Sequence, residues 1–197
     1  MEVDQRPLPD SNLPLQLATS RDGRHWTRVA KRATFLEPAA EGAWDDYYGS
    51  GYVRPATGLF VVGDQVRFYY SGSSAQEPLY GMGMASWRRD GFVSLSAGPQ
   101  GGELLTRSFI IDGPELHLNI DASAGEATVQ LCNLQGKPTL SWYWEDREEN
   151  FPSEPIRGDH LDVVVRWEDG DLAKWIGKPV TLRIRLKNAD LYSFWTT

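Results

Sequence analysis

The chain has 197 residues and a mass of 22.2 kDa, enough for one large domain or two small ones. Hydrophobic residues make up 41% and charged residues 24% of it, a balance that excludes wholesale disorder. The formal net charge of −7 disfavours nucleic acid or an anionic membrane as the main partner, because both would repel an acidic surface, whereas neutral ligands stay compatible.

The first segment, residues 1–14, is acidic, holds three prolines and offers few apolar anchors, so we expect a poorly ordered lead-in. It is unlike a secretory signal, and no apolar run in the sequence approaches the roughly 20 residues needed to cross a bilayer. The sequence as written therefore predicts a cytoplasmic protein, unless it is a fragment of a longer secreted one.

Residues 15–97 carry several hairpin signals. The pair Asp22–Gly23 in "SRDGRHW" predicts a tight hairpin, because glycine accepts a positive φ and aspartate can bond its own backbone. Gly63–Asp64 joins two strand-like runs in "GLFVVGDQVRFYYSGSS", and Asp90–Gly91 joins another pair in "YGMGMASWRRDGFVSLSAG". The number and spacing of these strands are typical of one four-stranded propeller blade.

Residues 98–197 continue in the same style after the linker-like "GPQGG". Strand-like runs such as "ELHLNIDAS", "ATVQLCNL" and "LDVVVRW" alternate with glycine-containing turns, which predicts an all-β fold with a sandwich or barrel here. The single cysteine, Cys132, excludes an internal disulfide framework and is expected as a buried small apolar residue. The one expected short helix is "DLAKWIG", capped by Asp171 and stopped by Gly177.

Four segments, in this order, carry a resemblance to a known group: "LATSRDGRHWTR", "GAWDDYYGSGYV", "VVGDQVRFYYSG" and "YGMGMASWRRDGFVSL". Together they resemble the last blade of the five-bladed β-propellers in proteins similar to glycoside hydrolase families 32 and 43. The closing "GKPVTLRIRLKNADLYSFWT" is similar to the β-sandwich that follows the propeller in bacterial members of that group. The resemblance implies a propeller-blade-like antiparallel unit at 15–97 and a jelly-roll-like β-sandwich at 98–197.

The resemblance does not supply catalytic residues. Those hydrolases hold their catalytic carboxylates on earlier blades, for which this sequence has no room, so no position can be carried over. A blade that stands alone exposes apolar faces and an unpaired edge. We therefore expect it to pack onto the sandwich or to form a homo-oligomer through the exposed blade faces.

The segment "EGAWDDYYGSGYVR" is best suited to a ligand site, because aromatic rings stack on sugar faces while carboxylates and guanidinium groups bond sugar hydroxyls. The candidate ligand-binding residues are Trp44, Tyr47, Tyr48, Tyr52 and Arg54, and the candidate catalytic carboxylates are Glu41, Asp45 and Asp46. Adjacent Asp45 and Asp46 would point to opposite faces of a strand and make a poor acid/base pair, whereas Glu41 could pair with either. The alternative is that the rings are core packing and the aspartates are turn or cap residues.

A second candidate segment is "SWYWEDREENF". In a strand, Trp142 and Trp144 share one face, which is either sandwich core or a further glycan-binding platform. The acidic run that follows, Glu145, Asp146 and Glu148, offers oxygen ligands for Ca²⁺. A solvated loop fits this run better, because it lacks the D-x-D-x-D-G spacing of a calcium loop.

The histidines His25, His117 and His160 are scattered, which argues against a zinc site. Strand alternation in "ELHLNID" would place His117 outward, opposite its leucine neighbours. The sequence as a whole predicts a carbohydrate-associated module that binds an oligo- or polysaccharide rather than cleaving it. The alternatives are a glycoside hydrolase with an oligomer-assembled or loop-borne carboxylate site, and a structural remnant without a ligand.

Overall fold

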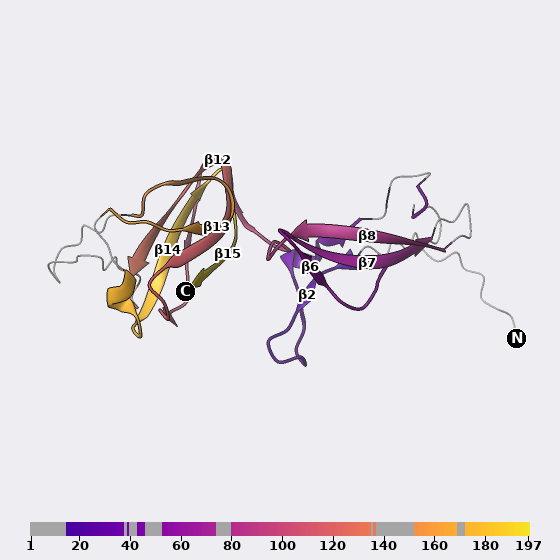
Figure 1. The fold of residues 1–197 in the computed structure, drawn as a ribbon, viewed down its shortest axis with the longest axis horizontal. Coiled ribbons are helices and arrows are strands. Elements are labelled where there is room, and N and C mark those ends of the chain that lie inside the picture. The colour runs from indigo at the N-terminus through magenta and orange to yellow at the C-terminus, as the bar shows by residue number, and fades with distance from the viewer. Residues whose placement is uncertain are drawn as a thin grey trace, which may run out of the picture. The chain divides into compact units, whose positions relative to one another are not determined.

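A computed structural model describes residues 15–37, 39, 43–45, 53–73, 80–134, 136, 152–168 and 172–197. The chain divides into two compact units, Met1–Arg88 and Arg89–Thr197, and both are built from β-strands, which confirms the all-β class (Figure 1). The sequence placed the boundary between 97 and 98. It lies earlier because strand β9 (Leu95–Ala97) pairs with β15 of the second unit.

The described strands of the first unit form three separate sheets. The pairs are β1 (Leu15–Gln16) with β4 (Thr34–Leu36) and β2 (Ala18–Thr19) with β3 (Thr27–Arg28), with a short 3₁₀ turn, Ala30–Arg32, between β3 and β4. The largest sheet contains β5 (Arg54–Pro55), β6 (Phe60–Val62), β7 (Gln65–Ser73) and β8 (Tyr80–Arg88). The first hairpin is confirmed, but the single four-stranded blade expected from the sequence is divided among these sheets.

Strand β7 is the centre of the largest sheet. It lies between β8 on one edge and β5 with β6 on the other, because Tyr70 pairs with both Gly83 and Pro55. Val62 pairs with Gln65, so the two residues between them, Gly63–Asp64, form the predicted turn, with a φ of 58° at Gly63.

The two faces of this sheet differ. Val66 and Phe68 of β7 are buried on what we call the covered face, where Phe35 of β4 stacks on the rings of Phe68 and Trp87 at centroid distances of 6.5 and 4.4 Å. The other face, which we call the open face, exposes large apolar side chains on three strands: Phe60, Val62, Tyr69, Met82 and Met84. Among the described residues of the first unit, the buried core therefore lies on one side of the largest sheet.

The described strands of the second unit form one seven-stranded sheet. Its strands are β9, β10 (Gly102–Leu105), β11 (Phe109–Ile110), β12 (Leu116–Cys132), β13 (Ile156–Val164), β14 (Pro179–Lys187) and β15 (Ala189–Thr196). All pairings between these strands are antiparallel, and the order β10–β14–β12–β15–β9 is completed by β11 on β14 and β13 on β12. Figure 1 shows β12 as the long strand that runs through this unit.

In the long strands of this sheet, the side chains that face the core switch between even and odd residue numbers at matching positions. Strands β14 and β15 follow one another along β12 and are separated at Asn188, whose φ is 45°. Core residues of β12 have even numbers up to Ala122 and odd numbers from Ala127, and those of β14 and β15 change in the same way between Leu186 and Ala189. This shared shift keeps one face apolar along both strands, so the bent sheet encloses a single core.

Gly125 lies at this bend. A Cβ atom there would come within 1.9 Å of the Lys187 carbonyl oxygen, so the two strands approach too closely for any side chain. The core that the bend encloses contains fully buried Leu118, Ile120 and Ile184. Within the described residues, no helix has the length and apolar character needed to cross a membrane.

Three local predictions in or beside the second unit can be compared with the structure. The hairpin at Asp90–Gly91 is wrong, because β8 pairs with β7 and β9 with β15, although Asp90 adopts a turn φ of 55°. The short helix is confirmed as a 3₁₀ turn, Leu172–Trp175, followed by Gly177 at a φ of 79°. Cys132 is buried as expected, and its burial raises the pKa of the thiol.

Candidate functional site

Trp44, Asp45 and Tyr70 form a cluster on the covered face of the first unit's largest sheet. The Tyr70 hydroxyl donates a hydrogen bond of 2.6 Å to Asp45 Oδ2, and the Trp44 ring stacks on the Tyr70 ring at a centroid distance of 5.8 Å. Asp45 is only 7% exposed, whereas Trp44 is 44% exposed. The cluster thus holds a buried carboxylate beside an accessible indole.

Glycines make room for this cluster. A Cβ atom at Gly81 would lie 2.3 Å from the Trp44 ring, and one at Gly83 would lie 2.5 Å from the Tyr70 ring. Both glycines belong to β8, whose alternate residues Met82 and Met84 point to the open face. The pattern "YGMGMAS" is therefore a strand with two glycines on one face and apolar side chains on the other. We call the surface of Gly81 and Gly83 beneath the two rings the glycine floor.

Burial and the Asp45 carboxylate both raise the pKa of the Tyr70 hydroxyl. Burial contributes most, and the hydrogen bond to Asp45 adds to it, so that the pKa of Tyr70 is raised to about 12. Tyr70 therefore keeps its proton at neutral pH and acts as a donor that orients Asp45. The cluster therefore has a fixed, partly exposed ring with a buried hydrogen-bond acceptor beside it.

The structure describes three of the site residues predicted in the first segment and separates one of them from the other two. Trp44 and Asp45 come together, but Arg54 pairs with Ser71, and this register places it on the open face. The remaining predicted residues of this segment lie outside the described residues: Glu41, Asp46, Tyr47, Tyr48 and Tyr52. Tyr70 and the glycine floor were missed, although the alternation of Phe68, Tyr70 and Gly72 was a usable signal.

The second predicted segment lies outside the described residues in full. This holds for the aromatic pair Trp142 and Trp144 and for the calcium candidates Glu145, Asp146 and Glu148. Among the residues that the structure does describe, no group of three or more His, Cys, Asp or Glu side chains is arranged to hold a metal ion.

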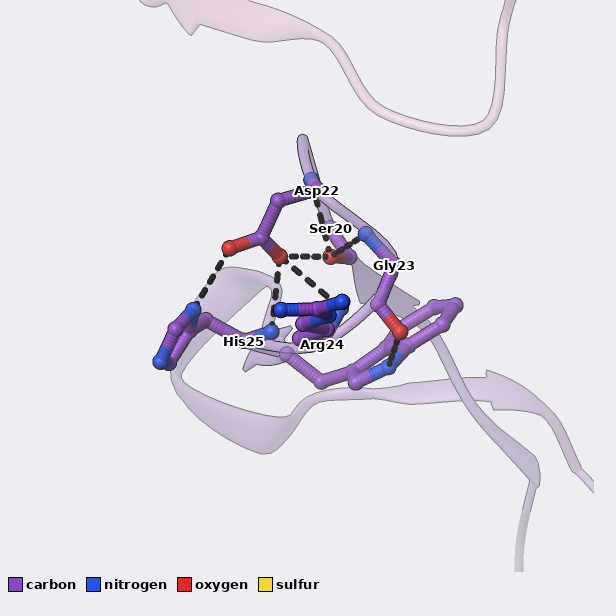
Figure 2. A network of polar contacts seen from close by, with 6 residues as sticks. Ser20, Asp22, Gly23, Arg24 and His25 are labelled. Carbon is purple, nitrogen blue, oxygen red and sulfur yellow. Dashed lines mark hydrogen bonds and ion pairs between the residues drawn. The ribbon is translucent and has the colours of Figure 1, made fainter.

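The hairpin loop "SRDGRHW" is held by one carboxylate (Figure 2). Asp22 Oδ1 accepts hydrogen bonds of 2.8 Å from the backbone N–H groups of Arg24 and His25, and Asp22 Oδ2 lies 2.5 Å from the His25 Nδ1 atom. These partners, the His25 side chain first, hold the pKa of Asp22 well below its ordinary value. The Trp26 indole N–H bonds to the Gly23 carbonyl, which fixes a ring that is 65% exposed at the end of the hairpin.

A histidine cluster in the second unit was also missed. His117 points away from the core as predicted, but it is only 9% exposed, because it stacks on Trp195 at a centroid distance of 5.3 Å. Its Nδ1 atom lies 2.6 Å from Asp162 Oδ1 and its Nε2 atom 2.8 Å from Thr197 Oγ1. The imidazole thereby links β12, β13 and the residue after β15, which makes it a cross-strand clamp.

An apolar hollow of about 210 Å³ lies on the covered face of the first unit. Its walls include Leu15, Phe35, Leu59 and Phe68, and Gln16 is the polar side chain among its lining residues. A wall of this composition offers few partners for sugar hydroxyls, so the hollow is a poorer site for a polar ligand than the Trp44 cluster.

Comparisons with protein-family models, with curated proteins and with solved structures give no match for this chain. The resemblance to propeller glycoside hydrolases therefore stays a prediction from the sequence segments that carry it.

Proposed function

We propose that the protein binds a neutral oligo- or polysaccharide, and that Trp44 is the stacking residue. The observation that supports this most directly is the Trp44 ring, which is fixed by Tyr70 and by the glycine floor yet remains 44% exposed. A rigid aromatic face loses little conformational entropy on binding, which suits stacking against the apolar CH face of a sugar ring.

The neighbouring polar groups fit the same ligand class. The buried Asp45 carboxylate is an acceptor for sugar hydroxyls in addition to the Tyr70 hydroxyl that already bonds to it. The formal net charge of −7 is compatible with an uncharged ligand and unfavourable for an anionic one. A neutral glycan is therefore preferred over an acidic one.

Binding is favoured over cleavage for a chemical reason. Glycoside hydrolysis needs two carboxyl groups, about 5 Å apart for retention or about 6.5–9.5 Å apart for inversion. Asp45 is the one carboxylate of the described cluster, and one of its oxygens is engaged by Tyr70. The hydrolase alternative predicts turnover of glycosides, which the following experiment also measures.

The test is affinity electrophoresis on a panel of neutral polysaccharides, with release of reducing sugar assayed in parallel. Trp44→Ala should weaken retardation by at least about tenfold, as expected for loss of an aromatic anchor. Trp26→Ala is the matched control, since it also removes an exposed tryptophan from the first unit. Trp44→Phe should restore part of the binding if stacking is the cause.

Three outcomes would overturn the proposal: no retardation of the wild-type protein on any neutral polysaccharide, equal binding by Trp44→Ala, or equal losses from Trp44→Ala and Trp26→Ala. Near-ultraviolet circular dichroism distinguishes a loss of binding from a loss of fold. Reducing sugar released by the wild-type protein would replace the binding proposal with the hydrolase.

A further inference from the structure

The β2–β3 hairpin and the turn after it differ in charge from the rest of the chain. Residues 21–32 contain five of the 20 Lys and Arg residues but one of the 27 Asp and Glu residues, in a chain of formal net charge −7. We call the five basic side chains the basic arm: Arg21, Arg24, Arg28, Lys31 and Arg32. All five are exposed, and Figure 1 shows the hairpin extending away from the largest sheet of the first unit.

The charges of the basic arm are not neutralised within the described residues. The one acidic side chain of this stretch, Asp22, is used inside the loop: Oδ1 accepts hydrogen bonds from the backbone N–H groups of Arg24 and His25, and Oδ2 pairs with His25 Nδ1. In the part of the chain that the structure describes, no ion pair joins the basic arm to an acidic group. Exposed and unpaired cations attract an anionic ligand.

An aromatic ring lies within the same stretch. Trp26 is exposed, and its indole N–H already donates a hydrogen bond of 3.2 Å to the Gly23 carbonyl oxygen. This bond holds the ring in place and leaves its faces, rather than its N–H, for a ligand. The basic arm therefore combines positive charge with a fixed surface for stacking.

The backbone of the turn after β3 is strained. Ala30, Lys31 and Arg32 have φ values of 48°, 54° and 71°, although none is glycine. This conformation is unfavourable for L-residues, and here hydrogen bonds from the Arg32 and Ala33 N–H groups to the Val29 and Ala30 carbonyls hold it. Strain of this kind clusters at binding sites, and the turn fixes the chain from which Lys31 and Arg32 project.

Cations beside an exposed ring fit a single-stranded nucleic acid better than other polyanions. Guanidinium and ammonium groups bind its phosphates, and an unpaired base offers a flat face to Trp26. An acidic peptide supplies charge without such faces, and a duplex keeps its bases stacked on each other.

The net charge of −7 disfavours a duplex or a membrane, which is broad enough to meet the acidic surface. A short single strand can follow the basic arm alone, because charges further away than about 8 Å are largely screened at physiological salt.

We propose that the basic arm binds single-stranded nucleic acid, with its basic side chains on phosphates and Trp26 stacked on a base. The site shares no residue with the proposed glycan site at Trp44, so either proposal can fail without the other.

The test is fluorescence anisotropy of a labelled oligothymidylate of about 12 nucleotides, titrated with the full chain at several salt concentrations. Five phosphate contacts predict a slope of about −3.5 for the logarithm of affinity against that of salt concentration, and Arg24→Ala should make it shallower by about 0.7. Arg107→Ala is the matched control, because Arg107 is exposed but belongs to the second unit, and it should leave the slope unchanged.

Stacking is tested separately from charge. Trp26→Ala should weaken binding of the oligothymidylate by about five- to 150-fold without changing the slope, because it removes a ring and no charge. Trp26→Phe should restore part of the affinity. Trp44→Ala should leave this binding unchanged, the reverse of the pattern expected with neutral polysaccharides.

Competition with polyglutamate and with carboxymethyl dextran compares other anions at equal concentration of charge, and both should bind more weakly than the oligothymidylate. Tighter binding of polyglutamate would assign the basic arm to acidic peptides, and tighter binding of carboxymethyl dextran to acidic polysaccharides. Either result would overturn the proposal, as would absence of binding at low salt, equal effects of Arg24→Ala and Arg107→Ala, or unchanged affinity in Trp26→Ala. Near-ultraviolet circular dichroism checks that each variant keeps its fold.

Discussion

The two units cover the apolar face of a β-sheet in different ways. The second unit bends one sheet so that its own strands enclose the core, and Leu118, Ile120 and Ile184 are fully buried within it. The first unit lays short segments over one face of its sheet, where Phe35 and Trp44 pack, and leaves Met82 on the other face in contact with solvent. The same all-β composition thus gives one self-contained unit and one unit with surface available for a partner.

This difference separates the roles of the units. A sheet that closes on itself gains stability from burial and offers few open groups, whereas an open face and an unprotected edge are typical of interaction surfaces. The proposed ligand site lies on the first unit. We therefore infer that the second unit serves mainly as a stable scaffold, and three substitutions can sharpen or break this contrast.

The largest fall in the free energy of unfolding is expected for a substitution at the bend of the second unit. Gly125→Ala would place a Cβ atom 1.9 Å from the Lys187 carbonyl oxygen, so a backbone strand must move and the packed core with it. We expect the free energy of unfolding to fall by about 3 kcal/mol or more, measured by urea titration with circular dichroism.

Gly98→Ala is the control for this substitution, because nothing lies within 4 Å of the Cβ position at Gly98. It should change the free energy of unfolding by no more than about 0.5 kcal/mol. Equal effects of the two substitutions would show that the sheet does not depend on close approach at the bend.

A smaller fall in the free energy of unfolding is expected for a substitution in the first unit. Tyr70→Phe removes the hydroxyl that bonds to the buried Asp45 carboxylate, so the unfolding free energy should fall by about 1–3 kcal/mol. The pKa of Tyr70 is raised from 10 to about 12 by folding, so its stabilising contribution is complete below pH 10 and is lost as pH rises through about 12.

The difference in stability between wild type and Tyr70→Phe should therefore shrink as the pH rises above 10. Urea titrations at neutral and alkaline pH, followed by tyrosine absorbance, measure this difference. A difference that stays constant over that range would contradict the role assigned to the Tyr70 hydroxyl.

Local patterns predicted much of the strand content but little of its pairing. The Gly63–Asp64 turn depends on adjacent residues alone, and the two strands that it connects pair as expected. The Asp90–Gly91 turn has the same local preference, but β9 finds a better partner in β15, about half the chain away. Turn residues alone do not indicate whether a strand pairs with its neighbour in the sequence or with a distant strand.

The candidate site shows the same limit. Trp44 and Asp45 were found because they lie in one short aromatic and acidic segment. Their partner Tyr70 lies 25 positions further along the chain from Asp45 and comes to it only through the sheet. The His117 clamp joins Asp162 and Thr197 across still larger separations, so the sequence could give its outward direction but not its burial.

The smallest effect is expected at the hairpin loop, where the Asp22 carboxylate bonds to Ser20, Arg24 and His25 without joining a core. Asp22→Ala removes the acceptor for the Arg24 and His25 backbone N–H groups, so these amides should exchange with deuterium faster. Arg21→Ala is the matched control, because it changes an exposed residue of the same loop outside the network in Figure 2.

The pH dependence of the loop follows from the lowered pKa of Asp22. Its ordered state is stabilised at pH values above 3.8, the ordinary value, and this contribution is lost as the pH falls below it. Exchange of the Arg24 and His25 amides should therefore report a looser loop in acid for the wild-type protein and little change for Asp22→Ala. The urea midpoint of the second unit should stay where it is in both proteins, because its core is enclosed by its own strands. A shift in that midpoint caused by Asp22→Ala would mean that the two units do not hold their stability separately, and the contrast between scaffold and interaction unit would fail.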